Sequence, residues 1–162
     1  MSRAIAIIWA AILVALPMGS HAEGGHQPPA EMLVAPEAVA RFVDTQEMSA
    51  PLAGEFASKD VVIVDNTSPY VFTGPDAVVR WAEMVKTHMK GITNLQHVFG
   101  EAHEFSRHGD HAYFSLPVTW TELYFGKRVV EHGAWVFVMV KEDDAWRVQA
   151  SVWGRVYSSP HK

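Results

Sequence analysis

The residue that most needs a chemical explanation is Asp65, the single acid that ends the apolar run Val61–Val64. A carboxylate in an apolar pocket has its pKa raised by desolvation, toward the range useful for a general base. The alternative is that Asp65 caps the turn at residues 66–68 through backbone amides. Both interpretations stay open at the level of the residue pattern.

Two further residues could take part in proton transfer, and a third could line the pocket. His97 lies in the middle of an expected strand, where it needs a polar partner; this is either Asp65, as an acid/base pair, or another buried group. Tyr113 either donates to a carbonyl oxygen or only packs its ring. Glu131 lies between apolar neighbours and either lines a pocket or forms a salt bridge with Arg147 on the next strand.

Metal and cofactor chemistry find little support in the sequence. The chain has nine histidines, and His103, His108 and His111 cluster around one expected turn. However, no HxH or HxxxH pair with a nearby acid is present. The chain has no cysteine, which excludes disulfides, thiol nucleophiles and thiolate metal sites. We therefore expect neither a metal nor a cofactor.

Length and charge restrict the class of protein. A chain of 162 residues with 49% hydrophobic composition suits one globular domain with a substantial core. The formal net charge is -5, with 13 basic and 18 acidic residues and no basic run. A nucleic-acid partner is therefore not expected.

The first 22 residues have the pattern of a secretory signal peptide. Arg3 precedes the apolar run Ala4–Leu16, Pro17 and Gly19 break it, and residues 20–22 fit a small-x-small cleavage site. The run is shorter than the roughly 20 residues that span a bilayer. We expect cleavage, a secreted or periplasmic protein, and no membrane contact after cleavage.

Hydrophobic periodicity predicts helices first and strands afterwards. A flexible leader is expected at 23–35 and a single domain at 36–158. Within the domain, the pattern predicts helices at 36–48 and 75–90 and strands at 61–64, 93–105, 111–124, 128–141 and 146–156. Successive strands joined by short turns must be antiparallel. The predicted class is α+β, with the helices packed on a curved antiparallel sheet.

Both faces of the predicted sheet are poor in charge. Side chains alternate along a strand, so 111–121 presents an apolar row beginning at Ala112 and a small, polar-tipped row beginning at Tyr113. The helices can cover only one face, and a second copy of the chain is the simplest cover for the other. We therefore predict a homodimer through the outer face of the sheet.

A concave, partly hydrated pocket is the expected place for the polar-tipped row. Aromatic walls with a few convergent polar groups are typical of small-molecule sites. The residues expected at this pocket are Tyr113, Ser115 and Thr119 beside Glu131, together with Gln149, Ser151 and Trp153 of the last strand.

The order of elements resembles the nuclear-transport-factor-2-like superfamily, which includes the SnoaL-like polyketide cyclases, ketosteroid isomerases and scytalone dehydratase. The resemblance covers roughly residues 36–157. It is carried by VVIVD with nine residues from Asp65 to Gly74, by GDHAY at Gly109–Tyr113, and by DDAWRVQASVW near the end. It implies a cone-shaped α+β barrel, with helices in the concave face of the sheet and a pocket for a small hydrophobic molecule.

The resemblance also extends to individual functional positions, but at two of them this chain has a different kind of side chain. The resemblance implies that Asp65 falls at the general base of the isomerases and that Trp81 and Trp153 face the pocket. Phe42 stands where those enzymes have an oxyanion tyrosine, and Trp135 stands near their second acid. Neither side chain supplies the acid proton that stabilises an enolate there, so steroid isomerisation is not expected.

Two functions follow from the sequence. The first is an exported SnoaL-like protein that binds a small hydrophobic molecule and acts as a cofactor-free lyase, isomerase or cyclase. Its base would be Asp65, its possible partners His97 and Tyr113, and its pocket residues would include Trp81, Val85 and Trp135. The second is a non-catalytic binding module or dimeric assembly module. Cavity volume separates them: catalysis suits about 300 Å³ or more, with Asp65 and His97 converging.

Overall fold

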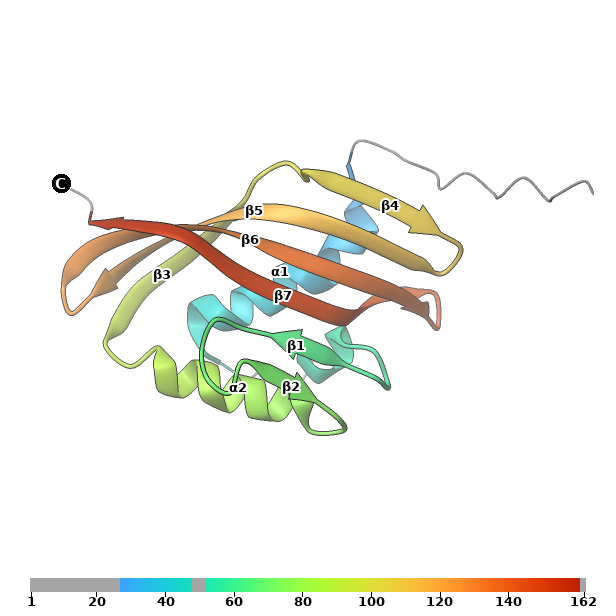
Figure 1. Cartoon of the computed structure of the whole chain (residues 1–162), viewed down its shortest axis with the longest axis horizontal. Helices are drawn as coiled ribbons and strands as arrows, with labels where there is room; N and C mark the ends of the chain where they lie inside the picture. The colour runs from blue at the N-terminus through green and yellow to red at the C-terminus, as the bar shows by residue number, and fades with distance from the viewer. Residues whose placement is uncertain (1–26, 48–51, 161–162) are drawn as a thin grey trace, which may run out of the picture.

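Two helices pack on the inner face of a curved sheet of seven strands in the computed structural model, which describes residues 27–47 and 52–160 (Figure 1). The expected signal peptide lies outside these residues. The helical elements are α1 (Ala30–Thr45), the short 3-10 helix η1 (Leu52–Glu55) and α2 (Ala77–His88). The strands are β1 (Val62–Val64), β2 (Val71–Thr73), β3 (Ile92–Phe99), β4 (Glu104–His108), β5 (His111–Tyr124), β6 (Lys127–Glu142) and β7 (Ala145–Pro160).

The sheet has the order β2-β1-β7-β6-β5-β3, and β4 also pairs with β5. All neighbours are antiparallel except β1 and β7, which run parallel. The predicted α+β class is confirmed. The sheet is mixed instead of purely antiparallel, because β1 joins the edge of β7 from a distant part of the chain.

Helix α1 begins earlier than the periodicity indicated. Pro36 looked like the first helical residue, but the helix starts at Ala30 and carries Pro36 inside it. An internal proline removes one backbone hydrogen bond and costs about 3 kcal/mol. Burial of Met32, Ala35 and Val39, each 0% exposed, offsets this cost, so residues 30–35 belong to the domain and not to a leader.

The expected long strand 93–105 is divided into β3 and β4. The chain leaves the ladder between Gly100, whose N–H donates to the carbonyl of Pro117, and His103, whose N–H donates to Ser115. Both bonds are 2.9 Å long, so the segment stays attached to β5 while it bends. Strand β5 itself has the bounds that the alternation predicted.

The register of β5 against β6 decides which side chains face the helices. Trp120 is paired with Glu131, and Leu116 with Trp135, so these four share the inner face. Their neighbours Thr119 and His132 are also paired and therefore share the outer face.

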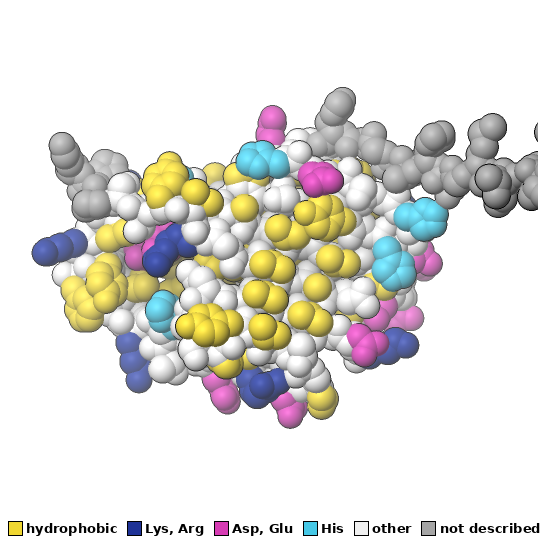
Figure 2. Space-filling view, viewed as in Figure 1, with side chains coloured by type: hydrophobic (Ala, Val, Ile, Leu, Met, Phe, Trp, Pro, Cys, Tyr) yellow, Lys and Arg dark blue, Asp and Glu magenta, His cyan; other side chains and the backbone are white. Residues whose placement is uncertain are grey.

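The core lies between the inner face and the helices, and its largest fully buried side chains include Trp81, Phe72, Phe114 and Phe137. Figure 2 looks onto the outer face of the sheet, where apolar side chains spread across the centre and charged groups lie mainly at the margins.

Within the described ranges, neither helix has the length and apolar character needed to cross a bilayer.

Candidate functional site

A small cavity lies inside the cone between α2, the β1–β2 turn and the inner face of the sheet. Its volume is about 80 Å³, well below the roughly 300–1,000 Å³ of typical ligand pockets. Its lining residues are Val43, Asp65, Asn66, Thr67, Trp81, Met84, Val85, His88, Met89, Ile92, Leu95, Trp120, Glu122, Glu131, Trp135, Trp153 and Arg155. Four of these lining residues are tryptophans.

Asp65 follows β1 directly and is held at the cavity wall by two donors. Trp81 Nε1 on α2 donates to Oδ2 at 3.1 Å, and the backbone N–H of Thr67 donates to Oδ1 at 3.0 Å. The carboxylate is therefore both a turn cap and a cavity group. Each oxygen keeps acceptor capacity beyond these bonds, so the group can still receive a proton from a bound molecule.

Indole rings form much of the cavity wall. Trp120, Trp135 and Trp153 lie on three neighbouring strands, with ring centroids 5.9–6.2 Å apart and interplanar angles of 49° to 89°. Trp81 faces them from α2, is 1% exposed, and packs against Phe42 at 5.5 Å. Phe42 belongs to the buried core and does not line the cavity.

Charged residues gather where β5, β6 and β7 meet on the inner face. Arg155 Nη1 lies 2.9 Å from Glu131 Oε1, so the ion pair expected for Glu131 forms with Arg155 and not with Arg147. Arg147 instead donates to the carbonyl of Gly54. Glu122 is 7% exposed; burial, and then the charge of Glu131, raise its pKa, while Arg155 lowers it to a smaller extent.

His97 does not meet Asp65. Its Nδ1 lies 2.6 Å from Asp44 Oδ2 and its Nε2 lies 3.0 Å from Glu37 Oε2, both on α1. Burial opposes protonation, but the hydrogen bonds and charges of Asp44 and Glu37 outweigh it, so the pKa of His97 is raised above 6.5. An imidazolium with two carboxylates joins α1 to β3, while the neighbouring Trp120 ring, 5.5 Å away, lines the cavity.

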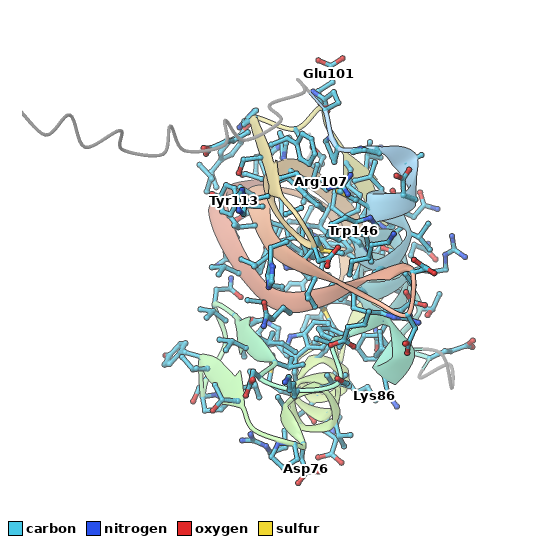
Figure 3. The ribbon with its side chains drawn as sticks, turned by 90° about the vertical axis from the view of Figure 1, so that its right-hand side faces the viewer. Asp76, Lys86, Glu101, Arg107, Tyr113 and Trp146 are labelled. Atoms are coloured by element: carbon cyan, nitrogen blue, oxygen red, sulfur yellow. The ribbon has the colours of Figure 1, made fainter. Side chains whose placement is uncertain are left out.

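Several expected pocket residues lie elsewhere. Tyr113, Ser115 and Thr119 are on the outer face because β5 alternates, and Figure 3 shows Tyr113 on the side of the sheet away from α1. Gln149 falls at the irregular register between β6 and β7, outside the cavity lining. Ser151 is on the inner face and 1% exposed, but its hydroxyl is buried without a partner and is not at the cavity.

The cavity brings together the other expected residues: Asp65, Trp81, Val85, Glu131, Trp135 and Trp153. Sequence reasoning missed Glu122, Arg155 and Trp120. Two of them, Trp120 and Glu122, could have been found from the alternation of β5, because residues two apart in a strand lie on the same face. In the part of the chain that the structure describes, no three His, Asp or Glu side chains converge as metal ligands.

No protein-family model and no curated protein sequence matches the chain. Several solved structures do match the chain. A hexachlorocyclohexane dehydrochlorinase (LinA) of type 2 has a TM-score of 0.65 at 11% identity, over 79% of this chain and 84% of that one. A candidate scytalone dehydratase from Novosphingobium aromaticivorans has a TM-score of 0.61 at 16% identity, over 79% and 83%. The protein Aln2 from a Streptomyces species has a TM-score of 0.61 at 18% identity, over 80% and 93%. At these identities the likeness is one of fold.

The His97 cluster predicts a stability that depends on pH. Because the folded-state pKa lies above the ordinary value of 6.5, the stabilisation is complete below 6.5 and is lost as the pH rises through the folded-state pKa. Urea unfolding should show that His97→Asn costs about 1.5–3 kcal/mol near pH 5.5 and clearly less near pH 8.5. The exposed His103, changed to Asn, should show no such difference; an equal cost of His97→Asn at both pH values would contradict the ion-pair account.

Gly133 predicts a steric requirement at the cavity wall. A Cβ there would lie 2.5 Å from the backbone oxygen of Gly154 and 2.9 Å from Trp153 Cζ3, and closer still to Cη2. Gly133→Ala must therefore displace both the indole and the β7 backbone beside it. We expect a loss of about 1–3 kcal/mol, with altered near-ultraviolet circular dichroism. Gly54→Ala is the matched control, because no atom lies within 4 Å of its new Cβ. Unchanged stability and spectrum in Gly133→Ala would show that Trp153 is not fixed there.

Proposed function

We propose that this chain, whose fold is that of the SnoaL-like proteins of the nuclear-transport-factor-2-like superfamily, binds one small, largely apolar molecule and moves a proton on it without a cofactor. Asp65 is the base. The observation that carries the proposal is the Asp65 carboxylate, fixed at the cavity wall by Trp81 and Thr67. A base positioned before the ligand arrives loses little freedom during the reaction.

The cavity limits the size of that molecule. An apolar protein cavity of about 150 Å³ can hold benzene. The volume here is about 80 Å³, below the roughly 300 Å³ expected of a catalytic cavity, and His97 does not converge with Asp65. The catalytic part of the proposal therefore rests on Asp65 alone, and a ligand is small unless side chains at the α2 side of the cavity, such as Met84 and His88, turn aside. The reaction class is correspondingly simple: elimination, isomerisation or ring closure within a compact molecule.

His97 is the second group with the surroundings of a base, but its raised pKa favours the imidazolium, so it must lose a proton before it can accept one, and it does not line the cavity. An imidazole with a carboxylate on Nδ1 has the arrangement of an activated base, and Asp44 supplies that carboxylate. Its Nε2 is occupied by Glu37, whose side chain is 46% exposed and must move before His97 can act. Asp65 needs no such movement, which favours it as the base.

Asp65→Asn tests the assignment. Small cyclic neutral, anionic and cationic molecules are screened by tryptophan fluorescence, and those that bind are incubated in D₂O and followed by NMR. The wild type should exchange a C–H proton, and Asp65→Asn should bind the same molecule but exchange it at least about 100-fold more slowly. Asp76→Asn, at the start of α2, is the matched control and should exchange like the wild type. Normal exchange by Asp65→Asn, with its loss in His97→Asn, would transfer the role to His97.

The apolar outer face favours a second function, assembly of two copies. Val136, Val138 and Val152 face outward near the centre of this surface, and Val152 is 40% exposed. Exposed apolar patches of this kind usually mark an interaction surface (Figure 2). We infer a homodimer through this face, which leaves the cavity of each copy intact. Export after cleavage of residues 1–22 belongs to the same proposal and rests on the sequence alone.

Val152→Lys tests the dimer. A lysine at the centre of a two-fold interface meets its own copy or apolar surface, so light scattering after size exclusion should change from dimer to monomer. Val79→Lys is the matched control, since Val79 is 45% exposed on α2, away from the sheet. A wild type that is monomeric at micromolar concentration would refute the assembly function and leave the cavity proposal standing.

A further inference from the structure

We propose that the cavity selects a small organic cation, an alkylated ammonium group seated against the indoles of Trp120, Trp135 and Trp153 beside Glu122. This inference rests on the proposed function in one respect, that the cavity binds a small molecule. It adds the charge and chemical class of the ligand.

The first support is the balance of charge around the cavity. Its lining contains the carboxyl groups of Asp65, Glu122 and Glu131, against the single permanent cation of Arg155. Arg155 is turned to Glu131 at 2.9 Å, and Asp65 already accepts two hydrogen bonds. When its acids are ionised the cavity has an excess of negative charge, which repels anions and attracts cations.

The second support is Glu122, a buried acid without a partner. It is 7% exposed and lines the cavity, and its carboxyl group takes part in no hydrogen bond or ion pair within the described ranges. A buried carboxylate is costly unless it is paired. The carboxyl oxygens of Glu122 are not among the fully buried atoms without a partner in the described ranges, so they are open to the cavity, where a bound cation would pair with the ionised group.

The third support is the aromatic wall. Indole faces attract cations through the ring quadrupole, and tryptophan does so most strongly among aromatic side chains. The three indoles are steeply inclined to one another, with angles of 49°, 65° and 89°, instead of being stacked face to face. Inclined rings can present faces to a compact tetrahedral group, and the soft thioethers of Met84 and Met89 line the same space.

Binding of a cation is coupled to the proton of Glu122. Burial and the charge of Glu131 raise the pKa of Glu122 in the empty cavity, whereas a bound cation favours its ionised form. Besides Glu131 and Arg155, the ionisable side chains that line the cavity with Glu122 are Asp65 and, on α2, His88. The affinity for a cation should therefore increase as the pH rises through the pKa of Glu122 and then level off, and this increase should be absent in Glu122→Gln. The affinity for a neutral molecule of the same shape should not increase in this way.

The test compares two probes of equal size and shape. Both exceed the 80 Å³ of the cavity, so each can enter only when side chains at its α2 side, such as Met84 and His88, turn aside. Tetramethylammonium and tert-butanol each have four substituents around a central atom, and only the first is charged. Each is titrated into the full-length wild-type protein at constant ionic strength, with tryptophan fluorescence as the readout, over the range from about pH 5 to 8. We expect the cation to bind at least about ten-fold more tightly than the alcohol at the higher pH, equivalent to about 1.4 kcal/mol.

Glu122→Gln keeps the shape of the side chain and removes its charge. It should weaken tetramethylammonium binding at least about ten-fold, abolish the pH dependence and leave tert-butanol binding unchanged. Glu101→Gln is the matched control, an exposed acid at the end of the molecule opposite α2 (Figure 3), and should bind like the wild type. The comparison of the two probes in the wild type needs no variant, so it decides the matter even if Glu122→Gln does not fold.

The outcomes separate the two proposals. Equal or tighter binding of tert-butanol, or unchanged cation binding by Glu122→Gln, overturns the cation assignment and leaves a cavity for neutral molecules. If neither probe binds while a neutral member of the wider panel does, the cation assignment falls alone. If no small molecule binds at all, both the cation assignment and the proposed function fall.

Discussion

The register between β5, β6 and β7 is the constraint on which the rest of the structure depends. These strands make the long central part of the sheet, and their hydrogen bonds set Trp120 beside Glu131 and Trp135 beside Trp153. A shift of one residue in any of them would exchange the inner and outer faces. The aromatic wall, the polar end of the cavity and the apolar outer surface all follow from this one alignment.

Burial of charge is handled differently at three places near the inner face. Asp65 has two donors, His97 has two carboxylates, and Glu131 has Arg155. Glu122 lacks such a partner and lies at the cavity. Native structures rarely leave a buried polar group unpaired without a functional reason. Among the described residues, the fully buried side-chain atoms without a partner are Asp44 Oδ1 and Ser151 Oγ, and neither residue lines the cavity. Glu122 is instead the unpaired acid that faces it.

The small cavity and the rigid wall belong together. Gly133 allows Trp153 to lie flat against β6, and Trp81 is held by both Asp65 and Phe42. Such packing leaves little room, so the site can discriminate by charge and shape but not accommodate a large substrate. The fold neighbours include a dehydrochlorinase at 11% identity. The chemistry of this chain must therefore be argued from its own side chains.

The sequence by itself determined the order of elements, the bounds of β5, and the position of Asp65 at the end of an apolar strand. It also placed Trp81 and Val85 on one stripe of a helix, because spacing within an element decides which residues share a face. Only the tertiary structure decided which faces meet. Glu131 belongs with Trp120 and not with Tyr113, and His97 belongs with Asp44, 53 residues away, and not with Asp65. The physical reason is that strand register and helix docking depend on the whole set of long-range contacts, which cannot be inferred from the spacing of residues within one element.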